Sequence, residues 1–193
     1  MVMLGKKEAL EKLAEQISHC RKCPLYRAAT QAVPGEGNPE ARIFLIGEAP
    51  GFWEDKNGRP FVGEAGQILE KLLDSVNLKR EEVFIGNVVR HRPPQNRDPL
   101  EAEIKACRPW FWKQLEIVNP KLIITLGRFA LEEFLPQEKI SKIHGQKREC
   151  LIDGKKKIVI PMFHPAAVLW NRRTQISLEE DFLKIRPLIK KIN

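Results

Sequence analysis

The hydrophobic positions of the chain follow two alternating patterns. Continuous apolar runs, rich in β-branched and aromatic residues and typical of buried strands, occur at residues 43–46, 83–89, 121–126 and 157–162. Apolar residues at helical spacing predict helices over residues 6–19, 66–78, 100–118, 127–134 and 177–191. Residues 52–63 are expected to form a loop. The alternation predicts an α/β fold in which helices cover both faces of a four-stranded parallel sheet, carried by one domain over residues 1–193.

Polar residues follow three of the predicted strands. Glu48 comes after the first strand, Asn87 lies near the end of the second with His91 nearby, and His164 follows the fourth. Ligands of open parallel sheets sit outside the carboxyl ends of the strands. Taken singly, Glu48 could be solvated, Asn87 could cap a turn and His164 could be a satisfied histidine. Their joint placement at one sheet edge indicates a site.

Composition narrows the function classes. The 33 Lys and Arg residues against 25 Asp and Glu give a net charge of +8, which favours a polyanionic partner. No stretch reaches the roughly 18 apolar residues of a membrane span, and no apolar leader is present, so we expect no membrane contact and a cytoplasmic protein. The pair Cys20 and Cys23 indicates metal binding rather than disulfides. A nuclease is disfavoured because the strand ends lack a carboxylate cluster for two metal ions.

Five motifs carry a resemblance to a known family. They are residues 47–51 (Gly-Glu-Ala-Pro-Gly), 58–63 (Gly-Arg-Pro-Phe-Val-Gly), 87–89 (Asn-Val-Val), 92–99 (Arg-Pro-Pro-Gln-Asn-Arg-Asp-Pro) and 164–169 (His-Pro-Ala-Ala-Val-Leu). Because the five motifs occur together and in this order, the chain resembles the family 4, iron–sulfur uracil-DNA glycosylases from Cys20 to about Trp170. The resemblance implies a three-layer α/β/α fold with a central four-stranded parallel sheet. It also implies a monofunctional DNA glycosylase of base excision repair that leaves an abasic site.

The resemblance assigns the substrate site. Phe61 matches the residue that stacks on the flipped uracil, and Asn87 matches the residue that reads its Watson–Crick edge. His164 is expected to stabilise the departing uracil, assisted by the backbone of Gly47, Glu48 and Ala49. Ala49 and Gly51 stand where a better-studied branch of the superfamily has an aspartate and a thymine-excluding tyrosine. The water-activating group therefore stays open among Glu48, Glu54 and Asp55, and Glu48 is our hypothesis for thymine exclusion.

The resemblance also implies a [4Fe–4S] cluster with one altered ligand. Cys20, Cys23 and Cys107 match the family's cysteines, whereas His91 occupies the remaining position. Imidazole can replace thiolate on iron. Zinc in a Cys₃His site and a three-cysteine cluster with an open iron are the alternatives. Cys150 matches no ligand position and is interpreted as a core residue.

The DNA-binding surface is expected to combine cations with an apolar wedge. Phosphate contacts are predicted for Arg92, Arg97 and Arg172, with Arg90 and Arg173 beside them. Leu169 or Trp170 is predicted to enter the gap left by the flipped base, whereas Trp110 and Trp112 are predicted to cover the core and the cluster. Relatives that trap uracil covalently carry a long insertion for which residues 93–99 leave no room, so turnover is expected.

The expected partner is uracil-containing DNA, single- or double-stranded, with uracil as product. We expect a nucleoid-associated monomer, and the sequence leaves open whether a sliding clamp docks on it. Two alternatives remain: a sister glycosylase with broader substrates, such as hypoxanthine or a thymine mismatch, and a metal-stabilised nucleic-acid-binding module without catalysis. The second would have no reason to keep Phe61, Asn87 and His164 together.

Overall fold

A computed structural model describes residues 5–192 and contains a six-stranded sheet in the order β1-β3-β2-β4-β6-β5. The four predicted strands are its parallel centre: β2 (Ile43–Gly47), β3 (Phe84–Asn87), β4 (Leu122–Leu126) and β6 (Lys155–Met162). The predicted fold class is confirmed. Two antiparallel edge strands, β1 (Glu36–Gly37) and β5 (Arg148–Ile152), were not predicted, because β1 is two residues long and β5 is only partly buried.

Helices account for most of the remaining chain. They are α1 (Lys6–Ser18), α2 (Phe52–Asn57), α3 (Glu64–Ser75), α4 (Glu101–Val118), α5 (Arg128–Glu132), α6 (Ile140–Ile143), α7 (Pro165–Val168) and α8 (Arg172–Ile192), with 3₁₀ turns η1 (Pro24–Arg27), η2 (Arg80–Glu82) and η3 (Pro94–Asn96). The structure differs from the predicted elements at several places, and two of the differences are large. Residues 52–57 are helical rather than a loop, and α8 begins at Arg172 because the Asn171 side chain accepts the N–H groups of Arg173 and Thr174.

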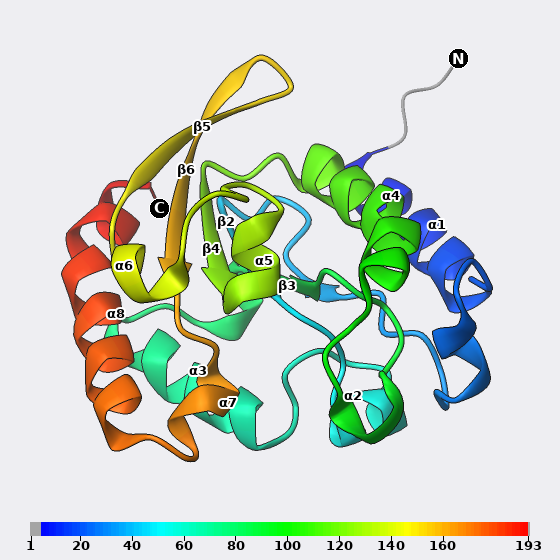
Figure 1. Cartoon of the computed structure of the whole chain (residues 1–193). Coiled ribbons are helices and arrows are strands. Elements are labelled where there is room, and N and C mark those ends of the chain that lie inside the picture. The colour runs from blue at the N-terminus through cyan, green and yellow to red at the C-terminus, as the bar shows by residue number, and fades with distance from the viewer. Residues whose placement is uncertain (1–4, 193) are drawn as a thin grey trace.

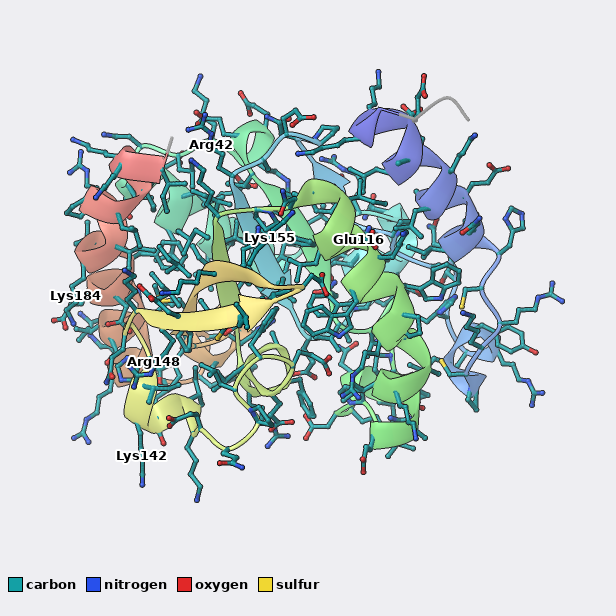
Figure 2. The ribbon with its side chains drawn as sticks, turned by 90° about the horizontal axis from the view of Figure 1, so that it is seen from above. Arg42, Glu116, Lys142, Arg148, Lys155 and Lys184 are labelled. Carbon is teal, nitrogen blue, oxygen red and sulfur yellow. The ribbon has the colours of Figure 1, made fainter. Side chains whose placement is uncertain are left out.

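Helices flank the sheet on both sides (Figure 1), and an apolar cluster lies between the sheet and each helical layer. Alternate residues of β2 point to opposite faces, as the period of a strand requires. Ile43 and Leu45 pack with residues of α3 and α8, whereas Phe44 and Ile46 pack with residues of α1 and α4. Seen from above, Figure 2 places Lys184 of α8 and the helices α1 and α4 on opposite sides of the strands. The sheet is thereby covered on both faces.

Strand register brings the predicted polar residues to one edge. Gly47, the last residue of β2, pairs with Asn87, the last residue of β3. Since β4 and β6 are parallel to β2, His164 beyond β6 emerges at the same edge. Within residues 5–192, no helix has both the length and the apolar character needed to cross a membrane.

Candidate active site

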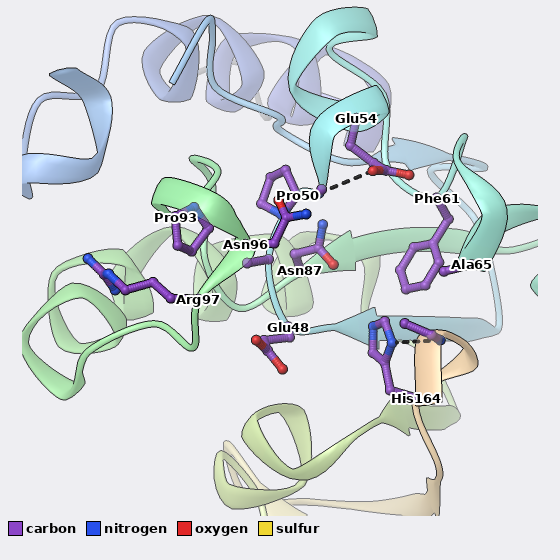
Figure 3. Close-up of a pocket in the computed structure, with 13 residues that line it drawn as sticks. Glu48, Pro50, Glu54, Phe61, Ala65, Asn87, Pro93, Asn96, Arg97 and His164 are labelled. Carbon is purple, nitrogen blue, oxygen red and sulfur yellow. Dashed lines mark hydrogen bonds between the residues drawn. The ribbon is translucent and has the colours of Figure 1, made fainter. Parts of the chain in front are cut away.

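A pocket opens at the carboxyl ends of the parallel strands (Figure 3). It contains most of the predicted substrate residues, and its lining consists of Glu48, Ala49, Pro50, Gly51, Glu54, Phe61, Ala65, Asn87, Pro93, Asn96, Arg97, His164 and Ala166. Sequence reasoning did not assign six of these residues to the site, although five of them lie within the five motifs and Ala65 follows one of them closely; the six are Pro50, Gly51, Ala65, Pro93, Asn96 and Ala166. Predicted Gly47 lies behind the pocket, where a Cβ would stand 2.4 Å from Asn87 Oδ1 and 2.6 Å from the Phe61 ring.

Phe61 forms one wall of the pocket. Its ring is stacked near that of His164, with centroids 5.7 Å apart and planes inclined by 29°. The residue is buried, and its backbone has a φ of +51°, a left-handed conformation that a phenylalanine rarely adopts. Such strain persists only where neighbouring structure enforces it and is frequent at functional sites.

Asn87 presents a free acceptor to the pocket. The side chain is buried, and its Oδ1 has no hydrogen-bond partner within the described residues. Buried polar atoms are rarely left unpaired without a reason. An amide oxygen of this kind can accept from an N–H of a bound planar ligand, and Figure 3 shows Phe61, Asn87 and His164 around one space.

His164 has a defined tautomer. Its Nδ1 accepts the backbone N–H of Ala166 at 3.1 Å, because His164 is the N-cap of α7. Loss of solvent around the ring lowers the pKa of His164 to about 4, so the imidazole is neutral at pH 7. A neutral ring that accepts at Nδ1 carries its proton at Nε2. His164 can therefore donate one hydrogen bond without bringing a charge.

The three candidate carboxylates have different surroundings. Glu54 accepts the backbone N–H groups of Gly51 at 3.1 Å and of Val62 and Gly63 at 2.8 Å each. Asp55 accepts the backbone N–H and the hydroxyl of Thr30. Both carboxylates thus hold loops in place.

The carboxylate of Glu48, by contrast, accepts no hydrogen bond within residues 5–192, although the backbone carbonyl of Glu48 accepts the N–H of Val89 at 2.9 Å. Burial and, secondarily, Asp98 raise the pKa of Glu48 to about 7, against a smaller opposing effect of Arg128. Glu48 is thus the pocket carboxylate whose protonation changes near neutral pH.

Of the predicted metal ligands, Cys20 and Cys23 lie between α1 and η1, Cys107 lies on α4, and His91 follows β3. The thiols of Cys23 and Cys107 share a hydrogen bond, which lowers the pKa of Cys23 to about 7 and raises that of Cys107. Cys20 accepts the Trp110 indole N–H at 3.1 Å, and buried His91 has an unpaired Nδ1. No three His, Cys, Asp or Glu side chains of the described chain are grouped closely enough to bind a single metal ion.

Arg90 was predicted to flank the DNA surface, and this prediction is wrong. Its side chain is fully buried: Nη1 donates to the Pro34 carbonyl at 3.1 Å, while Nε and Nη2 have no partner within the described residues. Desolvation lowers the pKa of Arg90 to about 10, and the charges of Cys107 and Cys20 act in the opposite direction. A buried guanidinium with two unused donors is destabilising unless an anionic group lies beside it.

The predicted DNA-contacting residues lie at the surface to different degrees. Leu169 and Trp170 are 42% and 90% exposed, and Arg172 is exposed. Arg97 is already paired with Glu103, at 2.9 and 2.7 Å. Arg92 is partly buried, with its guanidinium 5.1 Å from the Phe52 ring centroid. Trp110 and Trp112 pack against the core, as predicted, and half-buried Cys150 packs there as well.

Comparison with known proteins identifies related sequences. Residues 34–188 match the Uracil DNA glycosylase superfamily. The chain is 46% identical over 187 residues to the type-4 uracil-DNA glycosylase of Sulfurisphaera tokodaii, covering 94% of this chain and 85% of that protein. It is 44% identical over 193 residues to the type-4 enzyme of Thermotoga maritima, with 98% and 99% covered. A type-5 uracil-DNA glycosylase of Thermus thermophilus is 32% identical over 157 residues, with 65% and 71% covered.

Proposed function

The chain belongs to the uracil-DNA glycosylase superfamily, and from this premise we propose that it excises uracil from DNA by hydrolysing the N-glycosidic bond. The product is an abasic site, the first intermediate of base excision repair. The observation that carries the proposal is the pocket in which Phe61, the free oxygen of Asn87 and the neutral ring of His164 surround one space. The relatives compared are all named uracil-DNA glycosylases, and identity is greater to the type-4 than to the type-5 enzyme, which supports a type-4 activity on uracil.

Asn87 and Phe61 select the base. A flipped uracil stacks on the Phe61 ring and presents its Watson–Crick edge to Asn87. The free Oδ1 accepts from uracil N3–H, and the amide N–H₂ donates to O4. Cytosine has an acceptor at N3 and a donor at position 4, so the same amide would face unpaired buried groups.

His164 stabilises the leaving group. Cleavage develops negative charge on the departing uracil, and a positioned donor is most effective where charge develops. The tautomer set by Ala166 leaves the Nε2 proton of His164 for uracil O2. Because the pKa is about 4, this donor is present across the neutral pH range.

Glu48 accepts the proton of the attacking water. Glu54 and Asp55 have their carboxylate oxygens occupied by backbone donors, whereas the carboxylate of Glu48 lines the pocket without a hydrogen-bond partner in the described chain. A carboxylate with a pKa of about 7 is matched to general-base work near neutrality. The same side chain remains our hypothesis for excluding thymine's methyl group.

Cys20, Cys23, His91 and Cys107 hold a structural [4Fe–4S] cluster. Three observations support this ligand set: the thiol contact of Cys23 and Cys107, the unpaired Nδ1 of His91, and the unused donors of Arg90. These four residues would hold the cluster, and their thiolates would supply the anionic partner for the buried guanidinium of Arg90. Its chemical contribution is electrostatic and structural, tying η1 to α4 and to the loop after β3.

The partner is uracil-containing DNA, bound through exposed cations and with Leu169 or Trp170 as the wedge. The enzyme acts as a single-domain monomer at the nucleoid. A binding module without catalysis would not need a pocket with a free amide oxygen and a neutral donor.

The direct test is incubation of the purified protein with a labelled oligonucleotide carrying one uracil, followed by alkali. We expect cleavage only at uracil, only after alkali, and none in matched cytosine or thymine strands. Intact uracil strands would refute the proposed activity. A slow-migrating protein–DNA band resistant to denaturation would instead indicate covalent trapping and contradict turnover.

The cofactor is tested separately, by iron, sulfide and zinc content and by absorption of anaerobically purified protein. Four irons and four sulfides for each chain are expected from the cluster type. Stoichiometric zinc without sulfide would reject the cluster, whatever the activity.

A further inference from the structure

Two aromatic side chains are exposed side by side at the start of α2. Phe52 and Trp53 are 46% and 52% exposed, with ring centroids 5.2 Å apart and planes inclined by 81°. Large apolar groups that stay in contact with water forgo the stabilisation of burial. Neighbouring exposed aromatics therefore point to an interaction surface more strongly than scattered single ones do.

The same surface carries positive charge. Lys56 Nζ lies 5.5 Å from the Phe52 ring centroid and 5.8 Å from that of Trp53, and the Arg92 guanidinium lies 5.1 Å from Phe52. Within residues 5–192, neither Lys56 nor Arg92 forms an ion pair. The acidic residues of α2, Glu54 and Asp55, are buried and bonded inward. We call Phe52, Trp53, Lys56 and Arg92 the α2 patch.

The α2 patch borders the pocket. Gly51 and Glu54, on either side of the aromatic pair in sequence, both line the pocket, as does Pro93 next to Arg92. Figure 3 shows α2, with Glu54, along one edge of this space and Pro93 on the neighbouring loop. A DNA strand that delivers a base into the pocket must pass over its rim, so the nucleotides adjacent to that base come close to these rings.

We infer that Phe52 and Trp53 stack on bases flanking the flipped uracil in an unpaired DNA strand, while Lys56 and Arg92 contact that strand's phosphates. The inference rests on the proposed excision of uracil. Aromatic rings beside a cationic track are the common solution for binding single strands, because every base has a flat π-face. In a duplex those faces are covered by neighbouring base pairs. The α2 patch therefore favours single-stranded substrate.

The experiment removes the aromatic rings of Phe52 and Trp53 by substitution and the bases that flank the uracil by abasic analogues. Wild type and Phe52→Ala/Trp53→Ala are compared on a single-stranded uracil oligonucleotide, on the same strand with abasic analogues flanking the uracil, and on a uracil duplex. For the wild type, KM should rise about tenfold when the flanking bases are removed. For the double variant, KM on the intact single strand should rise about tenfold, with no further rise on the abasic-flanked strand. The duplex KM should change little.

Matched variants separate stacking from folding. Leu151 is 73% exposed on β5 and lies outside the pocket lining, so Leu151→Ala should leave every KM unchanged. Phe52→Tyr with Trp53→Phe should keep the discrimination, and the melting temperature of the alanine double variant should match wild type.

Equal losses on intact and abasic-flanked strands would overturn the stacking inference, as would an unchanged KM on the intact strand. Failure of wild type to cut any uracil strand would refute the proposed function itself, so the two failures are distinguishable.

Discussion

Arg80 donates a hydrogen bond from Nη1 to the carbonyl oxygen of Phe61 at 3.2 Å, and Nη2 donates to the carbonyl of Pro60. The guanidinium is held in turn by Glu36 and Glu70, each at 2.8 Å. On the other side, a Cβ on Gly66 would stand 2.0 Å from the Phe61 oxygen. The left-handed backbone of Phe61 is thus enforced from two directions, by an arginine that donates and by a helix that comes close.

The first prediction concerns Arg80. Arg80→Met removes the hydrogen bonds of a mostly buried guanidinium to two loop carbonyls and two carboxylates, so the free energy of unfolding should fall by about 2 kcal/mol or more. Because the Phe61 ring then loses its fixed position, kcat/KM for uracil DNA should fall by about tenfold or more. Denaturant unfolding and steady-state kinetics measure the two effects.

Arg59→Met is the matched control for Arg80. Arg59 pairs with the same Glu36, at 2.7 and 2.9 Å, but its side chain is 59% exposed and donates to neither loop carbonyl. Surface ion pairs contribute little, so stability and kinetics should stay close to wild type. Equal effects of the two substitutions would show that the ion pairs with Glu36, rather than the hydrogen bonds to the loop carbonyls, determine stability and rate.

The second prediction concerns the leaving-group donor. His164→Ala should lower kcat about 100- to 1,000-fold, the usual effect of losing one positioned donor. Asn87→Ala should lower kcat/KM because the uracil edge loses both of its partners. Single-turnover rates on a uracil strand measure both. Near-normal rates in both variants, with iron content unchanged, would remove these residues from the site.

Much of this site could be predicted because its residues directly follow continuous apolar strands. A polar residue after such a run must emerge at the sheet edge, which placed Glu48, Asn87 and His164 correctly. Arg90 follows β3 in the same way and was misassigned, since its burial depends on Pro34 and on cysteines that only the tertiary fold brings near. The local sequence pattern does not reveal these long-range contacts of Arg90.

Short elements were missed for a related reason. Helix α2 has six residues, too few for helical periodicity to appear, and its ends are set by Glu54 and by Gly58 at φ +68°. Arg80 lies 19 residues beyond Phe61, and nothing in the intervening sequence relates the two. Such contacts follow from packing and become visible only in three dimensions.

The third prediction is the pH dependence set by Glu48. Its pKa is raised to about 7, so the carboxylate form needed to accept a proton predominates only above that pH. The logarithm of kcat should rise with pH up to about 7 and then level off. Glu48→Gln should lower the rate and flatten this limb. An unchanged limb in Glu48→Gln would assign the titration to another group.

Stability gives an independent readout of the same carboxyl. A folded-state pKa above the ordinary 4.5 means that the native state binds the proton more tightly, so stability is lost as pH rises from 4.5 through about 7. Glu48→Gln lacks this loss, and its melting temperature should exceed that of wild type at pH 8 but not at pH 4. Parallel assays on thymine strands test whether Glu48 excludes thymine. If Glu48→Ala discriminates against thymine as well as wild type does, Glu48 does not have that role.

The fourth prediction concerns His91. If its imidazole is a cluster ligand, His91→Cys should retain iron and sulfide, whereas His91→Ala should lose them or bind them weakly. Loss of the cluster should lower the melting temperature, because η1, α4 and the loop after β3 are no longer joined. Iron content and visible absorption of the two variants decide the matter. Full iron content in His91→Ala would favour a three-cysteine cluster.

The fifth prediction contrasts two arginines of the DNA surface. Arg172 is exposed and forms no ion pair in the described chain, whereas Arg97 is neutralised by Glu103 at 2.7 Å. Each phosphate-bound cation adds about one unit to the slope of log K against log salt. Arg172→Gln should therefore reduce the slope by about one, and Arg97→Gln by clearly less.

The measurement is equilibrium binding to uracil DNA over a salt series, in the His164→Ala background so that the substrate stays intact. If Arg172→Gln and Arg97→Gln reduce the slope of log K against log salt equally, the prediction is contradicted. Arg97 must then leave Glu103 and bind a phosphate when DNA binds. That result would change the assignment of the loop after β3, because an arginine released by DNA makes the loop an active phosphate clamp rather than a prefolded edge of the pocket.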